Sequence, residues 1–282
     1  MLDKRGKKRH EGPNPNDIPK GMMLSTAIYD VLEGTRRMPM AVVLAWEDLK
    51  DRYRRSYLGL AWILLSFAAF ILVKTLVFSS IFDRPGYDYF SHLVIGFALF
   101  GFISQSIAGA ANLFLANRTW ILSTNLPYSL YAHVAVFRSL AELFLVSAAA
   151  LPLVIFLGGV HPGVLWSLPP AIALYYVTAF GLNLMLAPLG ARIRDLVHAM
   201  RTVMRMLFFA TPILWVATPG TTRSMVARWN PVTYYLDILR VPLMKGEFPA
   251  TAWVICLATS LGVLVLGLIV FSVTKKGVPR WL

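Results

Sequence analysis

An abrupt change in side-chain character near residue 57 limits the folds open to this chain more than any other feature of its sequence. In the stretch "EDLKDRYRR", residues 47–55, seven of nine residues are charged. The run that follows, residues 58–81, carries a single charge, at Lys74. About 20 mostly apolar residues in a helix cross the hydrocarbon core of a bilayer. The boundary therefore predicts that the chain passes from water into lipid at this point.

The composition extends this prediction to most of the chain. Hydrophobic residues make up 57% of the 282 residues and charged residues 15%, with a mean hydropathy of +0.62. Soluble domains average about 45–50% apolar and about 25% charged residues. We therefore predict an all-α integral membrane protein with six transmembrane helices. Their approximate limits are residues 58–81, 90–115, 125–156, 165–189, 197–217 and 250–274.

The distribution of basic residues predicts the orientation. The fifth run has only twelve uncharged residues after Arg205, a length that also suits a re-entrant segment. With six spans, 20 of the 27 Lys and Arg residues lie on the side of the two termini and 5 on the other side. Cytosolic segments are enriched in Lys and Arg. This count favours six spans with both termini in the cytosol, and it explains the net charge of +13 without a nucleic-acid partner.

Three segments outside the spans have distinct compositions. Residues 1–22 are basic and rich in Pro and Asn, which predicts a disordered cytosolic tail. Residues 23–57 are predicted to form amphipathic interfacial helices, or alternatively solvated juxtamembrane helices, with one apolar face lined by Val42, Trp46, Leu49 and Tyr53. Residues 58–282 form the six-span domain.

The segment 218–249 is too polar to span a membrane and too apolar for an ordinary loop. Within it, "WNPVTYYLDILRVP" has Asn230 as a helix cap, Pro231 in the first turn and Pro242 as a stop signal. We predict short re-entrant helices here, before the last span.

No motif for catalysis or cofactor binding is present. The five histidines are scattered, and neither a GxSxG nucleophile motif nor a phosphate-binding loop occurs. We therefore expect no catalytic residues, no metal site and no cofactor on this chain. If ATP drives its activity, the ATPase is another chain. Cys256 is the single cysteine and lies in an apolar run, where a buried structural role is expected.

Charged and aromatic residues within the spans are the candidate functional residues. Arg138 and Glu142 are spaced i, i+4 and are predicted to form an intramembrane ion pair, or a polar patch on a substrate path. Lys74 either extends to the membrane surface or contacts an anionic or hydroxyl-rich substrate. It shares a helix face with Trp62, Ser66 and Phe70, which follow at every fourth residue. Such rings pack against neighbouring spans or stack on sugars.

Five blocks of sequence, in this order, resemble the membrane subunit of bacterial type-2 polysaccharide ABC exporters. They are "DLKDRYRRSYLGLAWILLS", "STNLPYSLYAHVAVFR", "RIRDLVHAMRTVMRMLFFATPILW", "WNPVTYYLDILRVPLM" and "KKGVPRWL". Together they cover nearly the whole chain from residue 40. The closing "VPRWL" most resembles the permeases that export O-antigen, a part of lipopolysaccharide; other members export capsule or teichoic acid.

The resemblance implies a set of partners. The permease is a homodimer in the inner membrane, and two nucleotide-binding subunits dock beneath it and bind ATP and Mg²⁺. The substrate is a polysaccharide linked to undecaprenyl pyrophosphate.

The resemblance also implies roles for individual residues. The first and fifth spans face the substrate channel, which places Trp62, Ser66, Phe70, Lys74, Phe208 and Phe209 along it. Two cytosolic turns couple to the ATPase, and their candidate residues are Asn117, Arg118, Trp120, Arg192, Arg194 and Asp195. The alternatives are a type-2 permease for a lipid or a drug, and an intramembrane enzyme acting on a lipid-linked substrate.

Overall fold

The computed structural model describes residues 20–54, 56–79, 86–156, 161–217 and 220–282, and within these ranges the chain forms helices and no strand. The predicted spans correspond to α3 (Ala61–Ser79), α4 (Gly86–Ser104), α7 (Tyr128–Phe156), α8 (Leu168–Arg192), α9 (Asp195–Ala210) and α12 (Ala250–Thr274). The other α-helices are α1 (Lys20–Arg36), α2 (Met38–Tyr53), α5 (Ala110–Ala116), α6 (Arg118–Ser123), α10 (Thr222–Trp229), α11 (Pro231–Lys245) and α13 (Val278–Trp281). A π-helix, η2 (Gln105–Gly109), joins α4 to α5, and short 3₁₀-helices form η3 (Pro162–Ser167) and η4 (Lys275–Gly277). The predicted tail lies outside the described residues as far as residue 19, and helix α1 begins at Lys20.

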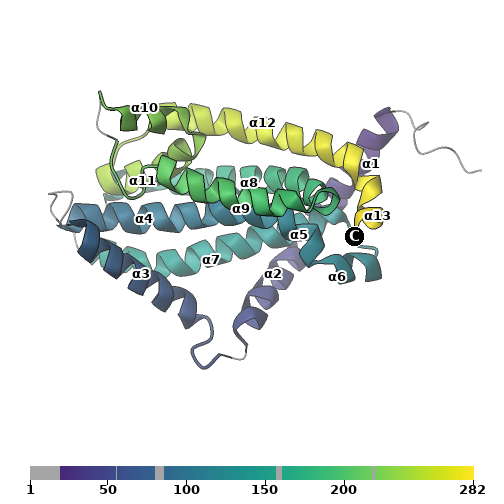
Figure 1. The fold of residues 1–282 in the computed structure, drawn as a ribbon, viewed down its shortest axis with the longest axis horizontal. Helices are drawn as coiled ribbons and strands as arrows, with labels where there is room; N and C mark the ends of the chain where they lie inside the picture. The colour runs from purple at the N-terminus through teal and green to yellow at the C-terminus, as the bar shows by residue number, and fades with distance from the viewer. Residues whose placement is uncertain (1–19, 55, 80–85, 157–160, 218–219) are drawn as a thin grey trace, which may run out of the picture.

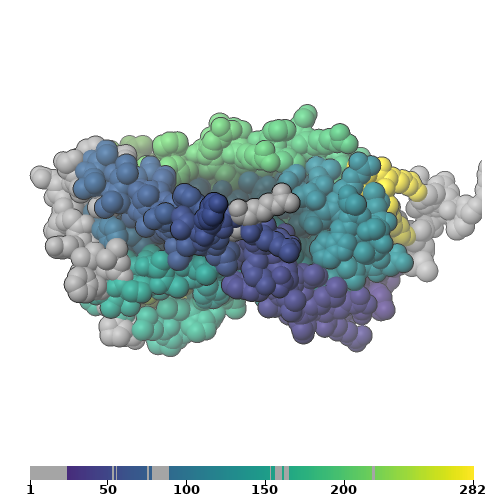
Figure 2. Space-filling view, turned by 90° about the horizontal axis from the view of Figure 1, so that it is seen from below, coloured from purple at the N-terminus to yellow at the C-terminus, as the bar shows by residue number. Residues whose placement is uncertain are grey.

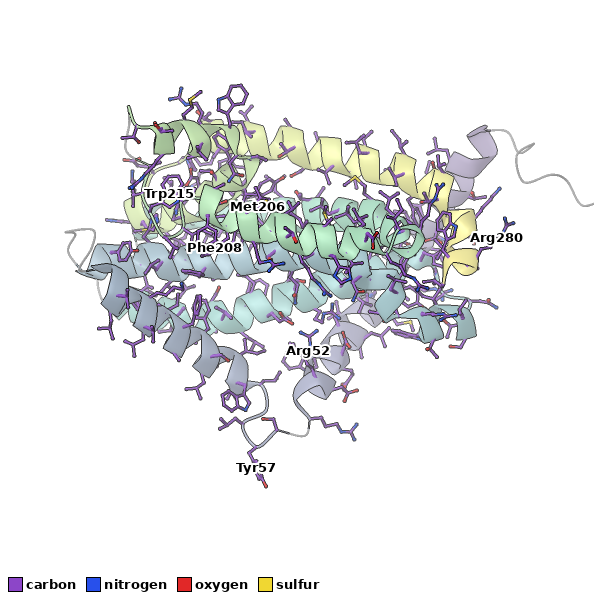
Figure 3. The ribbon with its side chains drawn as sticks, viewed as in Figure 1. Arg52, Tyr57, Met206, Phe208, Trp215 and Arg280 are labelled. Atoms are coloured by element: carbon purple, nitrogen blue, oxygen red, sulfur yellow. The ribbon has the colours of Figure 1, made fainter. Side chains whose placement is uncertain are left out.

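The long helices α4, α7, α8, α9 and α12 run side by side along the longest axis of the molecule (Figure 1). Helix α3 slants away from them and meets α2 at the tip of a V, where Tyr57 is fully exposed (Figure 3). Helices α1, α6 and α13 lie at the end that holds the C-terminus, which we call the C-terminal end. Helices α10 and α11 lie at the opposite end, which we call the α11 end.

Within the part of the chain that the structure describes, four helices are long and apolar enough to cross a membrane. They cover Tyr89–Ala116, Tyr128–Pro152, Leu165–Arg192 and Ala250–Trp281. The apolar part of α3, Ala61–Lys74, is shorter. The structure thus supports four of the six predicted spans by length and composition.

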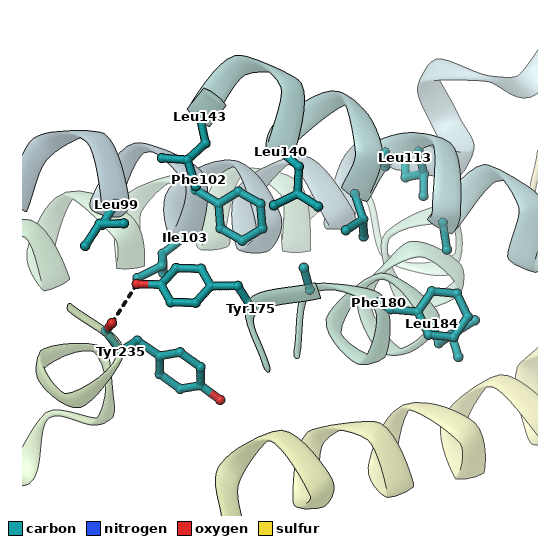
Figure 4. Close-up of a cluster of buried hydrophobic side chains, with 14 of the residues drawn as sticks. Leu99, Phe102, Ile103, Leu113, Leu140, Leu143, Tyr175, Phe180, Leu184 and Tyr235 are labelled. Atoms are coloured by element: carbon teal, nitrogen blue, oxygen red, sulfur yellow. Dashed lines mark hydrogen bonds between the residues drawn. The ribbon is translucent and has the colours of Figure 1, made fainter. Parts of the chain in front are cut away.

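The centre of the bundle is formed by large buried side chains of α4, α7, α8 and α11 (Figure 4). In this core the hydroxyl of Tyr175 donates to the backbone carbonyl oxygen of Tyr235 at 2.6 Å. A buried tyrosine hydroxyl needs such a partner, because an unpaired polar group in an apolar interior is unfavourable. The bond therefore ties α11 to α8.

Glycines allow α12 to pack directly on α8. A Cβ on Gly181 would lie 2.9 Å from the Leu264 Cα, and a Cβ on Gly267 would overlap the Gly181 carbonyl group. On the other side of α8, a Cβ on Gly190 would overlap the backbone of Ala111 in α5. Small residues at helix interfaces let backbones approach closely in membrane proteins. Helices α5, α8 and α12 therefore form one tightly packed unit.

The N-terminal helices attach to this bundle through polar contacts that the sequence did not reveal. Asp30 of α1 is buried, and its carboxylate accepts hydrogen bonds from the backbone amides of Ser129 and Tyr128 at 2.9 and 3.2 Å. It also pairs with Lys275 Nζ at 2.9 Å. The first amides of a helix lack partners within the helix. Asp30 thus caps α7 from another helix and joins α1, α7 and the end of α12.

Two local predictions need correction. Pro242 does not end its helix, since α11 continues to Lys245 and ends at Gly246, whose φ of 68° is left-handed. The predicted apolar face of α2 is also divided. Leu49 is buried, whereas Val42 and Trp46 are exposed, and the side chain of Tyr53 lies outside the described part of the chain. The face of α2 that packs on α7 instead includes Ala41 and Ala45, because small residues permit the close approach.

Candidate functional site

The open face of the molecule is hollowed between α3, α9 and the α5–α6 region (Figure 2). A groove of about 460 Å³ lies on this face, between α9 and the α4–η2 segment. Its lining is aromatic and aliphatic at one end and basic at the other: Phe100, Ser104, Ala108, Arg201, Met204, Arg205, Phe208 and Phe209. The face therefore combines apolar rings with positive charge.

A continuous row of phenylalanine rings connects the three helices of this face. The rings of Phe70 and Phe97 meet edge to face with centroids 4.8 Å apart. Phe208 lies 5.4 Å from Phe97, 5.5 Å from Phe100 and 5.2 Å from Phe209. Edge-to-face contacts of this kind are favourable because the positive edge of one ring meets the negative face of the other. The row crosses from α3 over α4 to α9.

Lys74 extends this row by a cation–π contact. Its Nζ atom lies 4.8 Å from the centroid of Phe70 and 5.6 Å from that of Phe97. The structure thus brings together four residues predicted for the substrate channel, which are Phe70, Lys74, Phe208 and Phe209. Of these, Phe209 is 70% exposed, so its ring is available on the open face.

Trp62 and Ser66 lie apart from this row. Trp62 is 45% exposed. The hydroxyl of Ser66 donates to the carbonyl oxygen of Trp62, four residues earlier in α3. Serine commonly forms this bond with its own helix. Ser66 therefore has no free proton to offer a ligand, and only its lone pairs remain.

Phe97 and Phe100 were not identified from the sequence. Both belong to α4, in which apolar residues surround the helix, so that no periodic pattern marks one face. Only the packing against α3 and α9 distinguishes these two rings from their neighbours.

The predicted fifth span is helical only as far as Ala210. The segment after it leaves the helix at Thr211, and side chains from elsewhere in the chain bond the Thr211 hydroxyl and backbone carbonyl oxygens of this segment. Asn230 Nδ2 donates to the Thr211 hydroxyl at 2.8 Å, and Arg240 Nη1 donates to the Pro212 carbonyl oxygen at 2.7 Å. Non-helical backbone at membrane depth requires such partners. The first turn of α11 and its buried Arg240 therefore hold the end of α9 in place.

Arg138 and Glu142 do not form the predicted pair with each other. Arg138 pairs with Asp48, and Arg52 Nη1 pairs with Glu142 Oε1 at 3.1 Å. Gln105, at the start of the π-helix, donates to the other oxygen of Glu142 at 2.8 Å. The i, i+4 prediction was wrong because α2 packs along α7 and supplies oppositely charged partners. The result is a polar junction of α2, α7 and η2, near Arg52 in Figure 3.

The first predicted coupling turn, between α5 and α6, lies at the C-terminal end (Figure 1). Asn117 Nδ2 bonds the carbonyl oxygen of Leu113 at 2.9 Å and closes α5. Arg118 is exposed, and the ring of Trp120 packs on Tyr131 with centroids 5.2 Å apart. The tryptophan therefore fixes the turn, and the arginine remains open to a partner.

The second predicted coupling turn joins α8 to α9. The guanidinium of Arg192 lies 5.5 Å from the ring centroid of Trp281 in α13. Arg194 and Asp195 are exposed, with Asp195 in the first turn of α9, where a negative charge suits the helix dipole. The structure thus presents Arg118, Arg192, Arg194 and Asp195 on the surface, with Arg192 against the Trp281 ring, and uses Asn117 and Trp120 for packing.

Comparison with known proteins gives one family and relatives that share one name. The profile of the ABC-2 type transporter family matches residues 41–244. An O-antigen export system permease protein RfbA from Myxococcus xanthus is 26% identical over 219 residues, which cover 74% of this chain and 82% of that protein. A protein of the same name from Klebsiella pneumoniae is 23% identical over 239 residues, 84% of this chain and 92% of its own length. Since the profile spans well over half of the chain and includes α3, α4, α9 and most of α11, the chain belongs to the ABC-2 type transporter membrane family.

Proposed function

We propose that this chain is the membrane subunit of an exporter that moves a lipid-linked polysaccharide of the O-antigen type across the bacterial inner membrane. The observation that carries the proposal is the row of phenylalanine rings on the open face. Sugar rings have C–H faces that pack on aromatic rings without a fixed hydrogen-bond geometry. Weak, repeated contacts suit a moving polymer, because tight binding at one place would stop it. The names of the relatives support this substrate class.

Arg201 and Arg205 support a lipid-linked substrate. They are spaced i, i+4 on the exposed side of α9 and line the groove, and neither pairs with a carboxylate among the described residues. Guanidinium groups bind phosphate oxygens through charge-assisted hydrogen bonds. We infer that they contact the pyrophosphate of an undecaprenyl carrier, while the polymer follows the aromatic row.

We also propose six crossings with both termini in the cytosol. Helix α3 has 19 residues, about 28 Å at 1.5 Å per residue, which is close to the thickness of about 30 Å of the hydrocarbon core. Helix α9 is shorter, and the bonded segment 211–217 extends it toward the α11 end. On this reading the C-terminal end is cytosolic and the α11 end is external.

The substrate path is proposed to form between two copies of the chain. In one copy, apolar side chains of α3 and α9 such as Trp62, Met206 and Phe209 are exposed. A path for a hydroxyl-rich polymer must be shielded from lipid on all sides. A second copy with its own α3 and α9 would close it.

ATP hydrolysis is assigned to a separate nucleotide-binding subunit, which would bind ATP and Mg²⁺. This subunit is proposed to dock at the C-terminal end, on the turns that carry Arg118, Arg194 and Asp195. No ATPase activity is expected from the purified chain alone.

The docking surface can be tested by charge reversal. We expect Arg194→Glu to weaken co-purification with the ATPase subunit about tenfold, which corresponds to about 1.4 kcal/mol. Arg223→Glu, an exposed arginine in α10 at the α11 end, is the matched control. Equal loss for both variants, or none for Arg194→Glu, would remove the coupling role of this turn.

Deletion of the gene tests the function itself. We expect a surface polysaccharide to disappear while its lipid-linked precursor accumulates in the cell, and we expect the intact gene to restore export. A polymer that still reaches the surface would contradict the proposal. If the deletion instead removes a lipid from the cell surface or lowers drug resistance, the chain is a type-2 permease for those substrates. Glycosyltransferase genes beside this gene would argue against that alternative.

A further inference from the structure

A second hollow, which we call the α11 pocket, lies at the α11 end. Its volume is about 410 Å³, within the range of about 300–1,000 Å³ found for small-molecule sites. Its polar lining comes from α4 and α11, and the segment after α9 supplies another wall: Tyr89, His92, Pro212, Thr233, Asp237, Arg240 and Lys245. The same segment follows Phe208 and Phe209 closely in the sequence, which links the pocket to the aromatic row along the chain. Trp215 marks this end in Figure 3, and its indole N–H donates to the Phe209 carbonyl oxygen at 3.0 Å.

The charges of Arg240 and Asp237 in the α11 pocket balance each other, and the exposed Lys245 adds one further positive charge to the lining. Arg240 is buried, and its Nη2 donates to Asp237 Oδ1 at 2.8 Å. Its Nη1 donates to the Pro212 carbonyl oxygen and lies 3.4 Å from the Nε2 atom of His92. An anion would meet the Asp237 carboxylate, and a metal cation would meet the Arg240 guanidinium. At the Arg240–Asp237 pair the pocket therefore favours an uncharged group of a ligand.

Two hydrogen-bonding atoms of the α11 pocket, on Thr233 and on Asp237, have no partner among the described residues. The hydroxyl of Thr233 has no partner among the described residues, although Thr233 is only 6% exposed. Buried polar groups in native proteins nearly always have a partner, and an exception calls for an explanation. The second oxygen of Asp237, Oδ2, likewise accepts no hydrogen bond within the described part of the chain. A carboxylate oxygen accepts, and a hydroxyl both donates and accepts.

We propose that the α11 pocket binds one neutral, hydroxyl-bearing sugar residue of the exported polymer. One sugar hydroxyl donates to Asp237 Oδ2, and a second exchanges a hydrogen bond with Thr233. Arg240 holds the carboxylate in position. This inference rests on the proposed function and adds to it a polar subsite that follows the apolar rings along the path. A polymer leaving the aromatic row would meet its first hydrogen-bonding site here.

Substitution of Thr233 by valine separates a binding role from a structural one. Valine has nearly the same shape and lacks the hydroxyl. If no ligand meets the hydroxyl, its removal relieves an unpaired polar group, so stability rises or stays equal and export is unchanged. If a sugar binds there, export falls about two- to tenfold, the loss expected for one neutral hydrogen bond, without loss of stability. Thr251→Val, an exposed threonine at the start of α12, is the matched control. Unchanged export by Thr233→Val would overturn the proposal.

Cysteine labelling tests occupancy and does not depend on the effect of Thr233→Val. Thr233→Cys in a Cys256→Ser background is treated in intact cells with a membrane-impermeant maleimide. We expect labelling in cells that make no polymer, and at least fivefold less labelling when a partner ATPase defective in hydrolysis holds polymer in the path. Equal labelling in both conditions would show that only water or solvent fills the pocket, and no labelling in either would show that it is closed. Both results overturn this proposal while the gene-deletion result stands, whereas export that continues after deletion refutes the proposed function itself.

Discussion

Helices α12 and α3 are both apolar, yet they attach to the bundle in opposite ways. Helix α12 packs backbone to backbone on α8, through Gly181 and Gly267. Helix α3 contacts α4 and α7 mainly through side chains, with Ile71 in a small cluster and Phe70 edge to face on Phe97. Packing of backbone on backbone leaves α8 and α12 no room to shift against each other, whereas ring contacts between side chains allow α3 to shift slightly on α4. The comparison divides the molecule into a fixed unit, built on α5, α8 and α12, and an open wall formed by α3 and α9.

Loss of Asp30 should have the largest effect, because this residue ties α1 to the fixed unit. Asp30→Ala leaves two amides of α7 uncapped and Lys275 unpaired, and breaking a buried ion pair typically costs about 3–5 kcal/mol. At about 2–4 °C per kcal/mol, we expect the melting temperature to fall by roughly 6–20 °C. Thermal unfolding of the purified protein followed by size-exclusion chromatography measures this shift.

Glu33→Ala is the matched control for Asp30, since Glu33 lies one turn further along α1. It pairs with the more exposed Arg37, and such a pair contributes about 0–1 kcal/mol. If the two variants have the same melting temperature, Asp30 does not anchor α1. Helix α1 would then not be joined to the fixed unit through this residue.

Overpacking the α8–α12 contact should have the next largest effect. Gly267→Ala places a methyl group against the backbone of Gly181, and neither helix can give way easily. Such overpacking costs about 1–3 kcal/mol. The control is Gly262→Ala in the same helix, where a Cβ meets nothing within 4 Å. We expect a lower melting temperature for Gly267→Ala alone, and equal values for both variants would show that α12 is as adjustable as α3.

The sequence was sufficient for the elements that depend on local composition. The limits of α12 agree with the predicted span, because a long apolar run between polar ends specifies a membrane helix directly. The end of α9 could not be predicted in this way. Residues 211–217 are as apolar as a span, and they leave the helix because Arg240 and Tyr89, distant in sequence, bond their backbone carbonyl oxygens, while Asn230 bonds the Thr211 hydroxyl.

The candidate site was predicted in part for the same reason. Phe70, Lys74, Phe208 and Phe209 were placed by the family resemblance, and the structure brings them together. Phe97 joins them from α4, which is apolar on all sides, so that no periodic pattern in the sequence distinguishes this ring. The ion pairs across α2 and α7 link residues 90 positions apart, which spacing within one helix cannot reveal.

Trp62→Ala should have the smallest effect on stability and tests the role of the open wall most directly. Trp62 is 45% exposed, whereas Phe70 packs on Phe97, so that truncation of Phe70 combines any loss of function with a loss of packing. Surface substitutions usually change stability by less than about 0.5 kcal/mol. We expect Trp62→Ala to keep its melting temperature and its complex with the ATPase subunit, and to export clearly less polymer, because a ring that lines the path acts on the moving chain alone.

Leu65→Ala, an exposed apolar residue on a neighbouring position of α3, controls for general loss of apolar surface. Export is measured as polymer on intact cells relative to the amount of permease in the membrane. Normal export by Trp62→Ala would show that the polymer path is lined by the phenylalanine row without Trp62. Loss of the assembled complex to the same extent as loss of export would show that this tryptophan packs in an interface between subunits.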